Sequence, residues 1–173
     1  VAQGDSSRSS QPLGASQATS AIAKAACGRA KSGASPRSGV SVRSTDGAGQ
    51  ESARALTFSQ GGGQALIAAQ PVDLTRQSNG EMAIAFRYRV DAAPSAPVVF
   101  KLGGGAVDLT ELLRSAPVGQ WREARIPLTC FRTDGGDLSR VEVPFHMATS
   151  GTLTVSVSEI KLDASQTETR CPA

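Results

Sequence analysis

The decapeptide Glu-Met-Ala-Ile-Ala-Phe-Arg-Tyr-Arg-Val, residues 81–90, decides the fold of this 173-residue chain. Its even-numbered residues are large and apolar or aromatic, whereas the odd-numbered ones from position 83 onward are alanines and arginines. In a β-strand, side chains with this period of two face opposite sides of the sheet. The stretch therefore predicts a half-buried strand, with Tyr88 in the core and Arg87 and Arg89 on the outer face.

Seven further stretches are short and rich in apolar residues, and they lie between Gly, Pro, Asp and Ser residues. They are residues 40–42, 55–58, 65–68, 98–102, 121–128, 141–147 and 152–162. Short strands at roughly ten-residue spacing are typical of a sandwich or jelly roll. In the last stretch the apolar residues change from odd to even numbers, which predicts a β-bulge near Ser158 and Glu159.

One short helix is expected between the strands. The sequence Asp108-Leu-Thr-Glu111 resembles a capping box, in which Asp108 accepts from first-turn amides and Glu111 reaches back. We expect the helix to span residues 109–114 and to end before Pro117. The predicted fold class is therefore all-β, a jelly-roll β-sandwich with one short helix.

Charge and composition divide the chain into a tail and a body. Residues 1–44 carry six basic side chains and one acidic one, whereas residues 45–173 carry twelve basic and fourteen acidic ones. We expect a Ser/Ala-rich basic tail or linker over 1–38, with some helical tendency, a sandwich domain over 39–163 and a C-terminal tail over 164–173. The near-neutral body argues against nucleic acid as a partner. No apolar run is long enough to span a membrane.

The cysteines predict a disulfide but no metal centre. Cys27, Cys130 and Cys171 form no C-x-x-C motif, and His146 is the chain's one histidine, so a zinc site lacks ligands. Cys27 and Cys171 both lie in flanking segments, so we expect a bridge between them. Cys130 lies in an apolar run and is interpreted as a small buried residue.

The strand at residues 121–128 offers the best candidate site. Ala124, Ile126 and Leu128 share one face, and Trp121, Glu123 and Arg125 share the other. Neighbouring strands are expected to add further polar groups to this face: Arg87, Arg89, Lys101, His146, Thr154, Ser156 and Ser158. An aromatic ring surrounded by hydrogen-bonding groups suits sugar recognition. The candidate ligand-binding residues are Trp121, Glu123, Arg125 and Arg87; in the alternative, a bulge turns Trp121 into the core.

Metal binding and catalysis have weaker signals. Asp46, Glu51 and Glu159, with Asp163, lie near the first and last predicted strands and are candidate ligands of a structural calcium ion, although acids at such positions are also commonly solvated. We expect no other cofactor. No G-x-S-x-G motif accompanies His146, so we assign no catalytic residue.

A series of motifs in order resembles one known family. The motifs are 50–58 (QESARALTF), 71–74 (PVDL), 86–90 (FRYRV), 107–110 (VDLT), 117–121 (PVGQW), 126–131 (IPLTCF), 136–139 (GDLS), 144–145 (PF) and 151–153 (GTL). Together they resemble the C-terminal galactose-binding-like (Exo-P type) domain of bacterial family 3 glycoside hydrolases, which are β-glucosidases and 1,4-β-glucan glucohydrolases. The resemblance covers about residues 40–162.

The resemblance implies a jelly-roll fold, a secreted or periplasmic location and a link to β-glucan breakdown. Family members often carry a cysteine in the turn written here as Gly103-Gly104-Gly105, which would pair with the position of Cys130; this chain has none. The family's catalytic domains are also absent from this sequence. We expect no activity from this chain alone; within a larger enzyme, it would belong to a β-glucosidase-type glycoside hydrolase.

The leading hypothesis is a non-catalytic accessory module that binds a β-glucan or oligosaccharide weakly, or docks onto a glycoside hydrolase catalytic domain. The alternative is an envelope structural or protein-interaction domain that uses the same sandwich without binding glycan.

Overall fold

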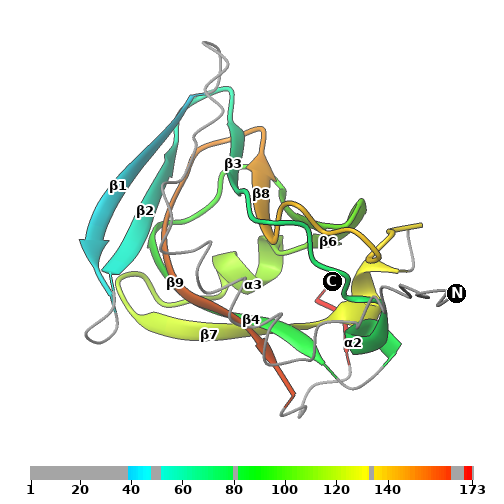
Figure 1. Cartoon of the computed structure of the whole chain (residues 1–173). Helices are drawn as coiled ribbons and strands as arrows, with labels where there is room; N and C mark the ends of the chain where they lie inside the picture. Colours follow the sequence, from blue (N-terminus) through cyan, green and yellow to red (C-terminus); the bar gives the residue numbers. More distant parts are fainter. Residues whose placement is uncertain (1–38, 48–51, 80–81, 133–134, 165–169, 173) are drawn as a thin grey trace, which may run out of the picture.

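The computed structural model describes residues 39–47, 52–79, 82–132, 135–164 and 170–172. Nine strands in these residues form two antiparallel sheets that face each other across the core (Figure 1). The five-stranded sheet has the order β1-β2-β9-β4-β7, and the four-stranded sheet has the order β3-β8-β5-β6. The predicted jelly-roll β-sandwich is confirmed.

The bounds of the elements follow the chain order. The strands are β1 (Val40–Asp46), β2 (Ser52–Phe58), β3 (Gly63–Ile67), β4 (Ala83–Ala92), β5 (Val98–Leu102), β6 (Gly105–Asp108), β7 (Trp121–Pro127), β8 (Phe145–Thr149) and β9 (Leu153–Asp163). The helices are α2 (Thr75–Asn79), α3 (Thr110–Arg114) and the 3-10 helix η1 (Leu128–Phe131). None of the helices in the described part of the chain is long and apolar enough to cross a membrane.

Strand β4, which contains most of the decapeptide, lies between β9 and β7 in the five-stranded sheet. Its even-numbered residues from Ile84 to Val90 are buried and Arg87 and Arg89 are only partly buried, so the predicted alternation is confirmed. Tyr88 is in the core, as expected. This alternation gives the sheet an inner apolar face and an outer polar face.

A cluster of phenylalanines joins the two sheets. Phe86 of β4 stacks on Phe100 of β5 with 5.5 Å between ring centroids, and Phe145 of β8 meets both rings edge-on. Phe131 of η1 packs against Phe100 at 5.8 Å. These rings are completely or almost completely buried, so they provide much of the apolar burial that holds the sandwich together.

The glycine-rich stretch after β5 is a hairpin turn, although its sequence predicts only a turn of unspecified kind. Gly103 and Gly104 have φ values of 56° and 87°, and they connect β5 to β6, a strand that the sequence does not predict. Two successive residues with positive φ form the hairpin turn whose twist matches the flanking strands. A Cβ atom at Gly105 would collide with the backbone of Phe131, so this position has no room for a cysteine side chain.

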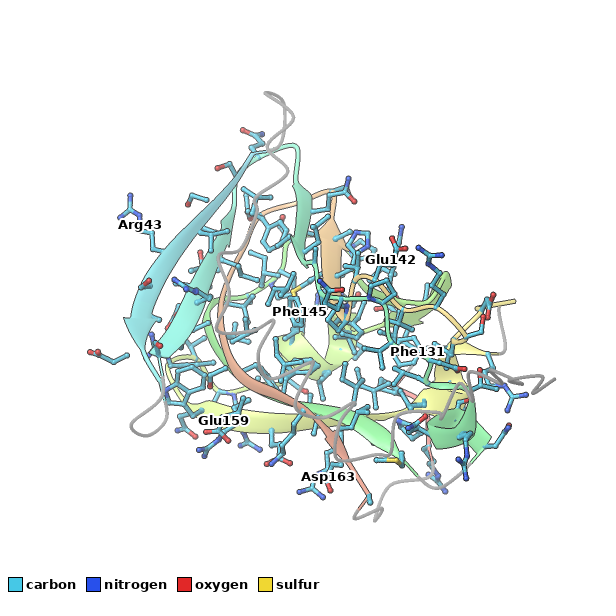
Figure 2. The ribbon with its side chains drawn as sticks, in the orientation of Figure 1. Arg43, Phe131, Glu142, Phe145, Glu159 and Asp163 are labelled. Atoms are coloured by element: carbon cyan, nitrogen blue, oxygen red, sulfur yellow. A yellow bond between two sulfur atoms is a disulfide. The ribbon has the colours of Figure 1, made fainter. Side chains whose placement is uncertain are left out.

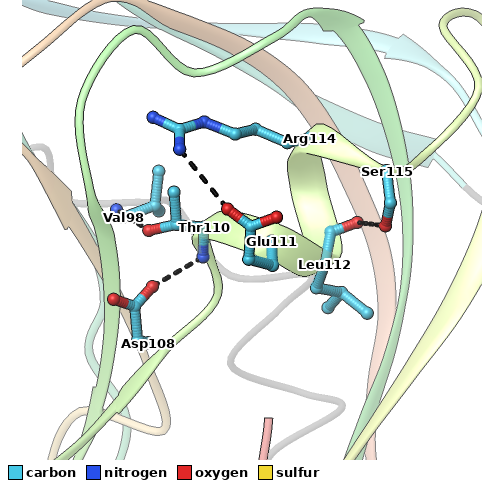
Figure 3. A network of polar contacts seen from close by, with 7 residues as sticks. All are labelled: Val98, Asp108, Thr110, Glu111, Leu112, Arg114 and Ser115. Carbon is cyan, nitrogen blue, oxygen red and sulfur yellow. Dashed lines mark hydrogen bonds and ion pairs between the residues drawn. The ribbon is translucent and has the colours of Figure 1, made fainter. Parts of the chain in front are cut away.

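The predicted helix is present, but its capping differs in one respect (Figure 3). The Asp108 carboxylate accepts a hydrogen bond from the Thr110 amide at 2.7 Å, as expected. Glu111 does not reach back; it pairs with Arg114 at 3.4 Å. The Thr110 hydroxyl instead accepts a bond from the Val98 amide and ties the helix to β5.

The predicted bulge in β9 is confirmed. Ser158 pairs with Arg87 and Lys161 pairs with Ala85, so Glu159 and Ile160 together lie opposite Phe86. Glu159 has φ 51°, and it is the one non-glycine residue with positive φ among those described. The extra residue shifts the parity of β9, which keeps Ile160 and Leu162 on the core side.

The backbone at Glu159 predicts an effect on stability. Because L-residues with a Cβ atom are strained in this region, we expect Glu159→Gly to be more stable than Glu159→Ala by about 1 kcal/mol. Both variants lose the same carboxylate, so each serves as the control for the other. The measurement is urea denaturation of both proteins; equal midpoints would contradict the assignment of strain to this position.

The cysteine prediction was wrong. Cys130 of η1 forms a disulfide with Cys171, with 5.6 Å between their Cα atoms, so Cys130 is not a free buried thiol and Cys171 does not pair with Cys27. Cys27 itself lies outside the described residues. The bridge ties the C-terminal segment to the sandwich. Sequence spacing gave no means of choosing between the two partners.

Loss of this bridge is expected to be costly. It joins cysteines 41 residues apart, and cross-links of that span restrict the unfolded chain enough to contribute about 2–4 kcal/mol. We expect Cys171→Ser to lower the free energy of unfolding by that amount and Cys27→Ser to leave it nearly unchanged. Denaturation of both variants, with peptide mapping of the wild type, checks this. A peptide linking Cys27 to Cys171 would refute the assignment.

Candidate functional site

Trp121 begins β7 and stands on the outer face of the five-stranded sheet. It pairs with Arg89 of β4, and the Arg89 guanidinium carbon lies 5.3 Å from the centroid of the indole ring. The side chain is partly exposed, and it is absent from the core of the described residues. The interpretation of Trp121 as a core residue is therefore wrong, because β7 is regular from its first residue.

A chain of polar contacts holds Arg89 in this position. Its Nε donates to Asp91 Oδ1 at 2.8 Å, and Asp91 Oδ2 accepts from the Ser156 hydroxyl of β9 at 3.1 Å. Val90 pairs with Val155 and Ala92 with Thr154, so Asp91 is the extra residue of a second bulge. Bulges redirect side chains, and this one allows the Asp91 carboxylate to contact Arg89 of its own strand and Ser156 of β9.

The remaining predicted residues lie on the same face in further ion pairs. Arg87 pairs with Glu159 at 3.3 Å, and Arg125 pairs with Glu123 at 2.6 Å and with Asp163 at 3.3 Å. Figure 2 shows the side chains of Glu159 and Asp163 pointing away from the core position of Phe145. Trp121, Glu123, Arg125 and Arg87 are therefore brought to one face, on two adjacent strands.

Two residues expected on this face lie on the other sheet. Lys101 is on β5 and His146 is on β8, where they pair with each other across the outer side of the four-stranded sheet. His146 Nε2 is 2.8 Å from Gln64 Oε1. Partial burial, and secondarily the charge of Lys101, lower the pKa of His146. Periodicity placed both residues on a polar face, but it could not tell which sheet the strands would join.

Asp91 is a residue of the candidate site that the sequence interpretation missed. It continues the odd-numbered series of Arg87 and Arg89, so the alternation itself carried the signal. The predicted strand ends at Val90 because Pro94 follows so closely. In the structure β4 continues to Ala92.

The calcium candidates do not come together in the described residues. Asp46 is exposed at the end of β1, and Glu159 is engaged by Arg87. Glu51 lies outside the residues that the structure describes. Within the described ranges, no group of three or more His, Cys, Asp or Glu side chains is arranged to hold a metal ion.

The outer face therefore combines one partly exposed indole ring with fixed donors and acceptors. Four basic side chains and four acidic ones lie there on β9, β4 and β7: Arg87, Arg89, Arg125 and Lys161 with Asp91, Glu123, Glu159 and Asp163. The charges cancel, and all of these groups except Lys161 take part in ion pairs within the face. Such a face can stack on an apolar surface and hydrogen-bond to hydroxyl groups.

Comparison with known proteins gives one family match. The model of the Exop_C family, described as galactose-binding domain-like, matches residues 19–162. Among curated protein sequences, none is significantly similar to this chain.

Several solved structures share the fold. The extra C-terminal domain of exo-1,3/1,4-β-glucanase from a Pseudoalteromonas species superposes with a TM-score of 0.58 at 14% identity, covering 78% of this chain and 76% of that domain. The family 30 carbohydrate-binding module of a cellulosomal cellulase of Clostridium thermocellum gives a TM-score of 0.57 at 16% identity, covering 73% and 83%.

The third structure contains a ligand. The family 11 carbohydrate-binding module of Clostridium thermocellum, in complex with a β-1,3-1,4-mixed-linked tetrasaccharide, gives a TM-score of 0.52 at 12% identity. The match covers 71% of this chain and 81% of that module. At these identities the likeness establishes the sandwich fold.

Proposed function

This chain belongs to the Exop_C family of galactose-binding-like domains, and from that membership we propose that it is a non-catalytic accessory module that binds β-glucan. Its binding face is the outer side of the five-stranded sheet, with Trp121 as the stacking platform. Glu123, Arg125 and Arg87 form the surrounding hydrogen-bonding groups. Arg89 and Asp91 complete this set.

The position of Trp121 carries the proposal. An indole ring costs free energy when it remains in water, so a folded protein normally buries it. Here the ring stands on a polar face instead, held beside Arg89 at 5.3 Å. Stacking on the apolar face of a pyranose would remove the exposed ring from water, and the neighbouring carboxylates and guanidinium groups suit the sugar hydroxyls.

The relatives support the choice of ligand and setting. One similar structure is the extra domain of an exo-1,3/1,4-β-glucanase, and another was solved with a mixed-linked β-glucan tetrasaccharide. A glycoside hydrolase catalytic domain of family 3 type is thus the natural partner. A secreted or periplasmic location would bring the module to its polysaccharide, and the Cys130–Cys171 disulfide suits an oxidising compartment.

The proposal predicts that Trp121→Ala weakens binding without unfolding the protein. We expect affinity for soluble mixed-linked β-glucan to fall at least about tenfold, equivalent to about 1.4 kcal/mol. The free energy of unfolding should fall by no more than about 1 kcal/mol, because the indole ring interacts with the rest of the protein mainly through a partly exposed cation–π pair. Calorimetry, with tryptophan fluorescence of the wild type, measures the binding.

A matched variant tests whether the surrounding ion pairs belong to the site. Arg89–Asp91 and Arg140–Glu142 are both pairs two residues apart with an Nε–oxygen distance of 2.8 Å, but Arg140 lies in the segment that leads into β8, a strand of the other sheet. Arg89→Ala should weaken binding, and Arg140→Ala should not. If wild-type protein binds no glucan and its fluorescence stays unchanged, the alternative of a structural or protein-interaction domain replaces the proposal.

A further inference from the structure

The middle of the outer face carries a stripe of small side chains. Ala53 and Ala55 of β2 lie beside Ser158 and Ser156 of β9, and Ala55 pairs directly with Ser156. Longer side chains rise on both sides of this stripe. Arg87 and Arg89 of β4 lie on one side, and β1 with Arg43 on the other.

One polar group in the small-residue stripe has no partner. Ser158 is only 5% exposed, and its hydroxyl makes no hydrogen bond. In the described part of the chain only Gln77 Oε1 shares this property, and it lies on α2, away from the outer face. Buried hydroxyls are nearly always paired, so an unpaired one needs an explanation.

The surroundings of this hydroxyl can rearrange. Arg87 is the register partner of Ser158 across β4 and β9, and Glu159 follows Ser158 with positive φ. The ion pair between Arg87 and Glu159 is 3.3 Å long, and its side chains remain 36% and 29% exposed. A partly exposed pair of this length is weak, so it can separate at little cost.

We propose that Ser158, Arg87 and Glu159 form a second glycan subsite next to Trp121. This inference rests on the proposed function. A sugar hydroxyl separates the Arg87–Glu159 pair, donates its proton to the Glu159 carboxylate and accepts hydrogen bonds from the Arg87 guanidinium and the Ser158 hydroxyl. The unpaired hydroxyl of the free protein thereby gains a partner in the complex.

The spacing of the two subsites sets the size of the ligand. Trp121 is on β7 and Ser158 is on β9, with β4 between them, so the subsites are about 10 Å apart across the strands. One pyranose ring cannot span that distance. The ligand is consequently an oligosaccharide chain that crosses β4, with one sugar residue stacked on Trp121 and a later residue over Ser158.

The test is the variant Ser158→Ala, with Ser41→Ala as the control. Ser41 is an exposed serine on the same face of the edge strand β1. The probes are cellobiose and the β-1,3-1,4-mixed-linked tetrasaccharide, with binding measured by calorimetry and stability by thermal melting. We expect Ser158→Ala to weaken tetrasaccharide binding at least about fivefold, to leave weak cellobiose binding unchanged and to keep or raise the melting temperature, because the variant removes an unpaired buried hydroxyl. Ser41→Ala should change none of these.

Each other outcome overturns the inference. If Ser158→Ala binds the tetrasaccharide like the wild type while Trp121→Ala does not, the glycan site stands and the second subsite is refuted. If the wild type binds cellobiose as tightly as the tetrasaccharide, the site holds a single short ligand and the proposed span is refuted. If the wild type binds neither sugar, the proposed function itself is refuted together with the subsite. A lowered melting temperature in Ser158→Ala would show that the hydroxyl is paired within the folded protein.

Discussion

The pairing of β4 with β9 and β7 is the constraint on which the rest of this structure depends. Because β4 alternates from Ile84 to Val90, its inner side provides Phe86, which stacks on Phe100 and meets Phe145 edge-on from the facing sheet. The same alternation sends Arg87 and Arg89 to the outer face. A shift of one residue in register would exchange these two sets, placing guanidinium groups in the core and aromatic rings in water. The core and the candidate site are therefore specified by one strand.

Two bulges beside this pairing place acidic side chains next to the arginines of the outer face. One bulge inserts Glu159 in β9, and its carboxylate pairs with Arg87. The other inserts Asp91 in β4, where it holds Arg89 and Ser156 together. A regular ladder would leave no extra residue at either place. The local departures from ideal β-structure thus supply the acids that neutralise the arginines, at the cost of a positive φ at Glu159.

The sequence predicted features that depend on local periodicity, and it failed where the answer depends on how distant segments meet. The alternation of β4 and the phase change in β9 could be read directly, and both are present. Parity alone would place Trp121 on the polar face, but the sequence could not exclude a bulge that turns it into the core, and that interpretation was wrong. In contrast, Lys101 and His146 have the expected alternation but belong to the second sheet, because the strand order is a property of the whole chain.

Short elements without periodicity were missed for a related reason. Helix α2 is polar, and the one signal of it in the sequence is Asp73, whose carboxylate accepts a hydrogen bond from the Thr75 amide at 2.8 Å. The disulfide partner of Cys130 could not be chosen either, since Cys171 lies 41 residues away and only the fold brings the two together.

The balance of charge on the outer face determines how a ligand could be recognised there. Its four basic and four acidic side chains cancel, so the face exerts little long-range attraction on an anion or a cation. Recognition must then depend on short-range contacts: the exposed part of one indole ring, carboxylates and guanidinium groups held by their ion pairs, and one unpaired hydroxyl. Such contacts favour an uncharged ligand with an apolar side and many hydroxyls. Pyranose rings in a glucan chain have this combination of surfaces. A face whose charged side chains are already engaged in ion pairs can therefore still bind such a ligand.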